Sequence, residues 1–124
     1  MEEDQQWSDR TILRAIDNPC PELNYETVIK DPEITFNGVK GQPDFGVVTI
    51  KYVPEASVIE LKALKSYFHD FRDKVISYER FISVVFEDLM ATYEPRSLII
   101  TAVFNPRGGM TSTLVVDSSA QSKT

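Results

Sequence analysis

The chain has 124 residues, of which 42% are hydrophobic and 10% aromatic, so its length and composition predict one globular domain with a buried core. Its single cysteine, Cys20, excludes an internal disulfide, and with one histidine the chain is too poor in soft ligands for a dedicated zinc enzyme. No apolar run approaches the ~20 residues that span a bilayer, and the acidic start does not resemble a signal or transit peptide. We therefore expect a cytoplasmic protein with no membrane contact and no bound metal.

The net charge of -6 is unevenly distributed along the chain. Residues 1–35 carry nine acids and three bases, whereas residues 36–124 hold ten of each. The acidic total argues against an extended, non-specific nucleic-acid binder. A local basic patch on the balanced remainder stays compatible with this charge.

In chain order, we first expect a disordered acidic tail over residues 1–9, a single domain over 10–116 and a second disordered tail over 117–124. Alternating residues predict a strand over 24–29. The stretch 36–46 contains three glycines and a proline, and this composition predicts a structured loop.

The β-branched segment 47–53 is the clearest strand, and Pro54 ends it. Ser57 and Glu60 have the spacing of a capping box, and apolar residues then recur at helical intervals. These features together predict an amphipathic helix over 58–73.

A second helix is expected from about Tyr78 to Tyr93, with Ser77 as its N-cap and Pro95 as its stop. Two strands follow, over 97–104 and 110–116, joined by a turn over 105–109. The order of two strands, two helices and two strands predicts an α+β fold: an antiparallel four-stranded sheet with two helices packed on one face. Because such a sheet has two open edges, we expect oligomers in which sheets continue between subunits.

Two segments carry charged groups with both structural and functional interpretations. Asp44, at the entrance of the strongest strand, serves either a turn or a cleft that needs a carboxylate. Lys62 and Lys65 are three residues apart on one helix face, which is either solvated or directed at an anion. Glu60 at the start of that helix is explained by capping alone.

Three more residues have competing interpretations. Glu79 lies in the first turn of a helix, where the dipole favours a carboxylate, and a carboxylate there also suits the N–H edge of a guanine-like base. Arg107, in an Arg-Gly-Gly turn, is a candidate phosphate contact. Cys20 lies between two prolines, so it is either an inert thiol or a rigidly held nucleophile.

Four segments recur together in one order that resembles the NADPH-dependent 7-cyano-7-deazaguanine reductases, the QueF family, from about Asn18 to Met110. They are GQPDF with Val48, Ile50 and Tyr52; Glu60 to Lys65 followed by Tyr67; Phe71-Arg72 and then Glu79; and Pro106-Arg107-Gly108-Gly109.

This resemblance implies a tunnelling fold, with subunits in rings that stack face to face, expected here as two stacked pentameric rings with active sites between neighbouring subunits. Glu79 matches the family's purine-anchoring glutamate, and Asp44 matches its proton-handling aspartate. Glu60 to Lys65 match the signature that the family associates with NADPH, although Ser66 departs from the usual bulky residue.

Two departures put ordinary reduction in doubt. Asn37 stands seven residues before Asp44, where the reductases carry the cysteine that forms a covalent thioimide with the nitrile. Tyr78 stands where the family has a histidine. We assign Asn37 and Tyr78, with Glu79 and Glu60, to the substrate-binding set.

The chain looks like the archaeal QueF-like branch, archaeosine synthase, which adds ammonia to the nitrile of 7-cyano-7-deazaguanine in the tRNA D-loop. No cofactor is needed for this amidinotransferase reaction. Because a thiolate is the usual nucleophile toward a nitrile carbon, we expect Cys20 to form the thioimide while Asp44 shuttles protons.

The expected partners are ammonia and tRNA that carries the modified base. Candidate phosphate contacts are Lys62, Lys65, Arg72, Lys74 and Arg107. Three alternatives stay open: a reductase whose cysteine has moved to position 20, a non-catalytic relative that binds the base or the tRNA, and a tunnelling-fold enzyme that acts on pterins.

Overall fold

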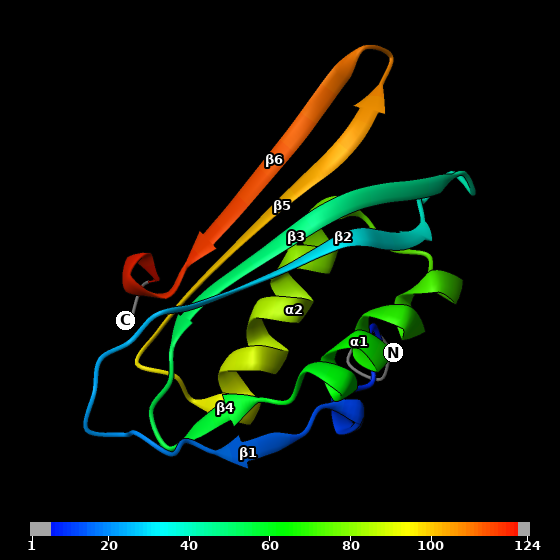
Figure 1. The fold of residues 1–124 in the computed structure, drawn as a ribbon. Helices are drawn as coiled ribbons and strands as arrows, with labels where there is room; N and C mark the ends of the chain where they lie inside the picture. The colour runs from blue at the N-terminus through cyan, green and yellow to red at the C-terminus, as the bar shows by residue number, and fades with distance from the viewer. Residues whose placement is uncertain (1–5, 122–124) are drawn as a thin grey trace.

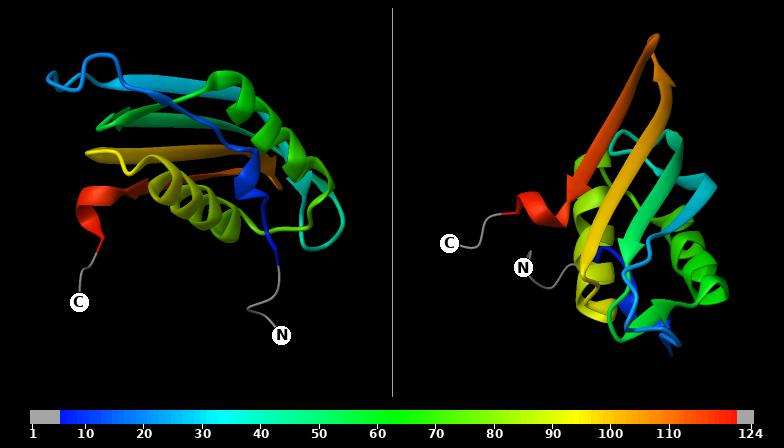
Figure 2. Two further views of the ribbon diagram at one scale, coloured as in Figure 1. Left: turned by 90° about the horizontal axis from the view of Figure 1, so that it is seen from below. Right: turned by 60° about the vertical axis from the view of Figure 1, so that its left-hand side comes forward.

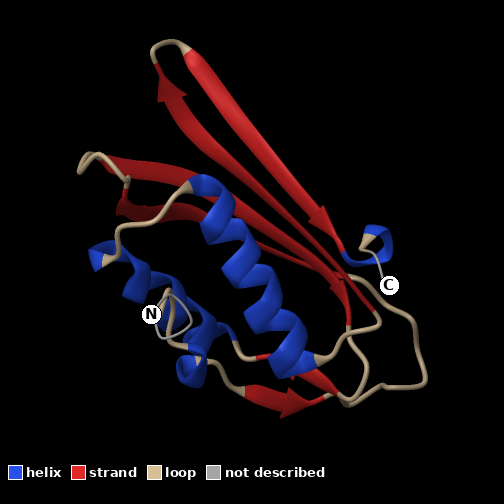
Figure 3. Cartoon of the chain, turned by 180° about the vertical axis from the view of Figure 1, so that it is seen from behind, coloured by secondary structure: helices blue, strands red, loops and turns tan. Residues whose placement is uncertain are grey.

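The computed structural model describes residues 6–121, except for the side chain of Arg107. Four strands form an antiparallel sheet in the order β2-β3-β5-β6, and opposite views of the molecule place two helices on one face of it (Figures 1 and 3). This is the α+β architecture that the order of elements predicted. The elements are β2 Thr27–Asn37, β3 Pro43–Val53, α1 Leu61–His69, α2 Tyr78–Tyr93, β5 Ser97–Arg107 and β6 Met110–Asp117.

The core lies between this sheet and the two helices. In β3 and β5, every second residue is buried, as expected for a sheet with one covered face. The inward set of β5 is Leu98, Ile100, Ala102 and Phe104, all at most 1% exposed. Helices α1 and α2 pack Phe68, Phe81 and Val85 against this face.

Helix α2 runs from Tyr78 to Tyr93, which confirms the predicted bounds. The Ser77 hydroxyl accepts a hydrogen bond from the Arg80 backbone N–H at 3.1 Å, so Ser77 is the N-cap. Glu94 adopts a left-handed conformation with φ of 45° and ends the helix before Pro95.

Helix α1 is shorter than predicted at both ends. Glu60 caps the helix by accepting from the Ala63 N–H at 2.9 Å, whereas Ser57 lies in a strand. The helix ends at His69, and the predicted remainder is a 3-10 turn over Asp70–Asp73. The predicted capping box of Ser57 and Glu60 was therefore wrong.

A small second sheet was not predicted. Strand β1, Ala15–Asp17, pairs antiparallel with β4, Ser57–Ile59, beside the main sheet (Figure 1). Each strand is three residues long, which is too short for an alternation pattern to show in the sequence.

The predicted tails are partly ordered. Trp7 packs against the core and lies 5.2 Å from the Arg80 guanidinium carbon, while Ser8 donates a hydrogen bond to Asp88. Residues 6–9 are therefore part of the domain, and residues 1–5 lie outside the described part of the chain. At the other end, Asp117 ends β6 and a 3-10 turn follows over Ser118–Ala120.

The sheet leaves both outer strands without a neighbour on one side. Strand β2 is one edge, and it carries Pro32, which lacks a backbone donor, within an irregularity between Asp31 and Ile34. Strand β6 is the other edge, and the β5–β6 hairpin extends past the rest of the molecule (Figure 2). These open edges agree with the expectation of oligomers but leave it a prediction.

Candidate functional site

Two chain segments that are far apart in sequence meet at one end of the sheet. Strands β2 and β3 are joined by the loop 38–42, in which the Gly38 N–H donates to the Gln42 carbonyl at 2.7 Å and Gly41 has a positive φ of 86°. The segment before α2 is bound to this hairpin. The Asn37 N–H donates to the Lys74 carbonyl at 2.9 Å, and the Ile76 N–H donates to the Asn37 carbonyl at 2.9 Å.

These bonds place the first turn of α2 beside the hairpin, and an open pocket of about 220 Å³ lies between them. Its walls come from the hairpin loop on one side and from the start of α2 on the other. The residues that line it are Gly38, Val39, Lys40, Gln42, Asp44, Ile76, Ser77, Tyr78 and Glu79.

Asp44 is the buried acid of this pocket, at 4% exposure. It pairs with Phe36 across the hairpin and so faces the helical side of the sheet. The Tyr78 hydroxyl donates to Asp44 Oδ1 at 3.3 Å. The pocket thus holds a carboxylate and a phenol in hydrogen-bonding distance, a pair able to receive and return a proton.

Tyr78 is itself held by aromatic side chains. Its ring stacks on Phe104 with centroids 4.0 Å apart and planes 2° from parallel. Phe36 completes this packing in an edge-on contact, with centroids 6.4 Å apart and planes at 69°.

Glu79 lies in the first helical turn, on the pocket wall, and its side chain is exposed. Asp44, Tyr78 and Glu79 are thus three predicted site residues that the structure brings together. Asn37 is adjacent through its backbone bonds but does not line the pocket. It pairs with Pro43, so its side chain belongs to the opposite face of the sheet from Asp44.

Cys20 lies at the opposite end of the sheet. Its loop joins β1 to β2, and Asn18 binds it to the turn after β3 by bonds to the Ala56 and Glu55 carbonyls at 3.0 and 2.9 Å. The Cys20 N–H donates to Asn18 Oδ1 at 3.0 Å, and the thiol side chain is half-buried. Asp44 lies at the start of β3 and the Cys20 loop is bound to the turn after its end, so one chain does not bring the two side chains together. Figure 1 shows these two ends of β3 at opposite ends of the sheet.

Glu60 is also remote from the pocket. Its carboxylate caps α1, and it lines neither the pocket at the hairpin nor the groove beside α1. Its assignment to the substrate-binding set stays a prediction that a single chain does not support.

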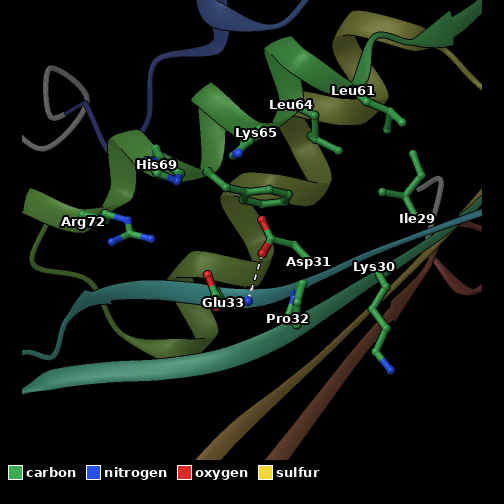
Figure 4. Close-up of a pocket in the computed structure, with 11 residues that line it drawn as sticks. Ile29, Lys30, Asp31, Pro32, Glu33, Leu61, Leu64, Lys65, His69 and Arg72 are labelled. Carbon is green, nitrogen blue, oxygen red and sulfur yellow. Dashed lines mark hydrogen bonds between the residues drawn. The ribbon is translucent and has the colours of Figure 1, made fainter.

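The candidate tRNA contacts fall in different places. Lys65 and Arg72 line a groove of about 330 Å³ between α1 and the edge strand β2, together with His69 and opposite Asp31 and Glu33 (Figure 4). Lys62 is exposed on the same helix, outside the groove.

The last two candidate phosphate contacts are Lys74 and Arg107. Lys74 is half-buried, and its ammonium lies 3.5 Å from Asp70 Oδ2. Arg107 has a side chain outside the described part of the structure, so its role stays a prediction.

Three residues that contribute to the site were not foreseen. Lys40 and Gln42 line the pocket from the hairpin loop, and Phe104 supports Tyr78 from β5. The loop residues were adjacent to Asp44 in the sequence, whereas the Phe104 contact depends on the pairing of β3 with β5 and has no local signal.

Within residues 6–121, no cluster of three or more His, Cys, Asp or Glu side chains is arranged to hold a metal ion. In the same range, the helices are all too short or too polar to cross a membrane.

Residues 43–123 match the family model described as QueF-like protein. The chain belongs to the QueF-like protein family. It is 42% identical over 113 residues to an NADPH-dependent 7-cyano-7-deazaguanine reductase from Chlorobium phaeovibrioides, which covers 90% of this chain and 97% of that protein. A reductase of the same name from Chlorobium chlorochromatii is 41% identical over 112 residues, with 90% and 97% covered.

The fold of this QueF-like protein is also that of a solved relative. A crystal structure of the archaeosine synthase QueF-Like in its apo form superposes with a TM-score of 0.71. It is 17% identical and covers 78% of this chain and 96% of that chain, so the likeness concerns the fold. The tunnelling fold that the sequence motifs implied is thereby confirmed for the single subunit.

Proposed function

We propose that this QueF-like protein binds 7-cyano-7-deazaguanine in tRNA and adds ammonia to its nitrile, which yields the amidine of archaeosine without NADPH. One observation carries the proposal. The position of the reductase cysteine holds Asn37, while Asp44 and Glu79 still meet in one pocket with Tyr78. The chain thus keeps groups that bind a purine and move protons but has no thiol among the residues that line this pocket.

The pocket suits a guanine-like base bearing a short polar substituent. The exposed carboxylate of Glu79 is an acceptor for the two adjacent N–H groups on the pyrimidine edge of such a base. The nitrile at the opposite edge then extends toward Asp44 and Tyr78, which lie deeper. The volume of about 220 Å³ fits a single heterocycle rather than a dinucleotide.

The chemistry balances without an oxidant or reductant. The ammonia nitrogen forms a bond to the nitrile carbon, one π bond of the nitrile breaks, and the nitrile nitrogen takes up a proton. Asp44 accepts the proton that ammonia loses and returns it to that nitrogen, so that R–C≡N and NH₃ give R–C(=NH)NH₂. The hydrogen bond from Tyr78 orients Asp44 for both transfers.

The route through a Cys20 thioimide requires a second subunit, because Cys20 and Asp44 of one chain are at opposite ends of the sheet. In a ring whose sheets continue edge to edge, every subunit keeps the same strand direction, so Cys20 stays at the far end there too. The geometry therefore favours direct addition promoted by Asp44.

The direct experiment uses tRNA bearing 7-cyano-7-deazaguanine with ammonium and without NADPH, followed by digestion and mass measurement of the nucleoside. A mass gain of one ammonia supports the proposal, and a nitrile that stays unchanged overturns it. Asp44→Asn should lower the rate by about 100-fold or more, since it cannot accept the proton.

Cys20→Ala decides between the two routes. Full activity in this variant supports direct addition, and loss of activity with retained folding supports a thioimide formed across subunits. A covalent adduct on Cys20, seen in the mass of the intact protein, is the positive sign of the second route.

Reduction is the second candidate, because relatives about 40% identical over 90% of this chain are named NADPH-dependent reductases. The same assay with the free base and NADPH tests it. Oxidation of NADPH coupled to formation of an aminomethyl group would replace the main proposal.

We further propose that subunits join through the free edges of β2 and β6 into rings, expected as two stacked pentamers.

We also propose that the tRNA is held by basic side chains near the groove beside α1. Lys62→Glu with Lys65→Glu should weaken tRNA binding and reduce the slope of its salt dependence by roughly 2, which is about one unit for each lysine that no longer binds a phosphate. Lys51→Glu, on the uncovered face of the sheet, is the matched control, and an unchanged slope in the double variant would remove both lysines from the interface.

A further inference from the structure

Phe104 lies behind the proposed pocket and shapes it without lining it. The side chain is 1% exposed, and its ring is parallel to that of Tyr78 at 4.0 Å. Tyr78 in turn donates its hydrogen bond to Asp44. The three side chains come from β5, α2 and β3, so the stack joins three elements at the base of the pocket.

The Phe104 ring occupies this place because Gly46 has no side chain. Gly46 pairs directly with Phe104 in the β3–β5 ladder. A Cβ at position 46 would lie 2.8 Å from Phe104 Cδ1 and 2.9 Å from the Val103 carbonyl oxygen, distances that real Cβ atoms essentially never show. Any larger residue at position 46 must therefore displace the ring or the strand.

Phe104 is held on its other sides by aromatic edges. Phe36 meets it at 5.8 Å with planes at 71°, and Phe81 meets it at 6.3 Å with planes at 78°. Close packing on these sides restricts the orientation of the Phe104 ring, against which Tyr78 stacks.

We infer that Phe104, placed by Gly46, is a positioning residue. It sets the orientation of the Tyr78 ring, and the Tyr78 hydroxyl in turn orients the carboxylate of Asp44 that transfers the proton. The inference rests on the proposed function for its kinetic consequence but not for its structural one. The parallel ring of Phe104 is the platform against which the Tyr78 phenol lies while its hydroxyl reaches Asp44.

The kinetic experiment is a double-mutant cycle on amidine formation. Tyr78→Phe should lower kcat by about 10- to 100-fold with KM changed by less than about 3-fold, because it removes the hydrogen bond that orients Asp44 for proton transfer. Phe104→Leu should lower kcat to a similar extent, since misplacement by about 1 Å has effects of this size. The two losses should not multiply: in the Tyr78→Phe background, Phe104→Leu should cost less than about 3-fold more.

The matched control is Phe71→Leu. Phe71 is equally buried and belongs to the same aromatic cluster, yet it contacts Tyr67 and Phe81 rather than Tyr78. It should leave kcat within about 2-fold of the wild type at a temperature where all variants are folded. Multiplicative losses for Phe104→Leu and Tyr78→Phe, or an equal loss of kcat in Phe71→Leu, would overturn the inference.

A second measurement is independent of any reaction. The near-ultraviolet circular dichroism of wild type minus that of Tyr78→Phe isolates the signal of Tyr78, which should be strong because the ring is rigidly stacked. The same difference taken in the Phe104→Leu background should collapse, and in the Phe71→Leu background it should persist. If the difference survives Phe104→Leu, the stack does not position Tyr78, whereas an inactive wild type with the expected spectra overturns only the proposed reaction.

Discussion

Asn37 has no nucleophilic side chain, but its backbone holds the site together. Its backbone N–H donates to the Lys74 carbonyl and its carbonyl accepts from the Ile76 N–H, and these bonds attach the start of α2 to the hairpin. A side chain can change at such a position while the backbone bonds persist. The pocket between Asp44 and Glu79 therefore does not depend on a thiol at position 37.

Glu79 allows a test of base recognition that is separate from catalysis. Glu79→Gln replaces one acceptor oxygen by a donor that faces the N–H groups of the base, so the affinity for 7-cyano-7-deazaguanine should fall by about 10- to 100-fold. Calorimetric titration of the free base measures this. Glu87→Gln, an exposed residue two turns further along the same helix, should bind as the wild type does. Equal affinity in both variants would mean that Glu79 does not contact the base.

At the scale of elements, Asp88 connects three parts of the chain. This carboxylate is 4% exposed in α2, and it accepts from the Tyr67 hydroxyl at 2.6 Å and from Arg10 Nε at 2.8 Å, as well as from Ser8. The N-terminal segment, α1 and α2 thus share one acceptor. Trp7 adds its contact with Arg80, which directly follows the pocket residue Glu79 in the first turn of α2.

Asp88→Asn should lower the free energy of unfolding by about 2–4 kcal/mol, because an amide leaves buried donors without a charged acceptor. Urea denaturation followed by circular dichroism measures the change. The exposed neighbour Glu87→Gln should stay within about 0.5 kcal/mol of the wild type. A small loss in Asp88→Asn would show that the N-terminal segment contributes little to stability.

Elements with strong local signals were predicted well. Helix α2 has a serine cap, an apolar face over four turns and a proline stop, so its bounds follow from the sequence alone. The short pairing of β1 with β4 and the order of residues 6–9 depend on contacts with distant segments. Trp7 was the one local signal of that order, since a large aromatic residue in a polar stretch tends to be buried.

At the scale of the whole molecule, buried phenols make stability sensitive to high pH. Burial raises the pKa of Tyr93 to about 12 from 10.0, and burial also raises the pKa of Tyr52. Burial, with the negative charge of Asp88, raises the pKa of Tyr67 far above its usual range. Each group favours the protonated form in the folded state, so its contribution to stability is complete below the unfolded pKa near 10 and is lost as the pH rises through its raised folded-state pKa, which for Tyr93 is about 12.

The free energy of unfolding should accordingly lose no contribution from these phenols between pH 8 and 9.5 and should fall from about pH 10 upward. Urea titrations at several pH values measure it, and phenolate absorbance should rise together with unfolding. Three of the five tyrosines should ionise only as the protein opens. Ionisation of all five in a folded protein would contradict the buried placement.

The site could be predicted only in part, for reasons of distance along the chain. Asp44 and Glu79 were recognised from motifs, and the bonds of Asn37 to the segment before α2 then bring them together. Cys20 was assigned a catalytic role because it is the only thiol in the sequence. In one subunit it lies at the other end of the sheet from Asp44, and its role stays a prediction. Phe104 carries no motif of its own, because its importance arises from its partner strand.

The separation of Cys20 from the pocket has a practical consequence. Strand β2 runs from Thr27 to Asn37 and spans roughly 33 Å at about 3.3 Å per residue. Asn37 is next to the pocket, whereas Cys20 lies in the loop that leads into the other end of the strand, at Thr27. A chain with a single natural thiol accepts one reporter dye without engineered substitutions. A fluorophore attached there stands clear of the base pocket, so changes in its emission would record subunits meeting or RNA arriving at that end of the sheet.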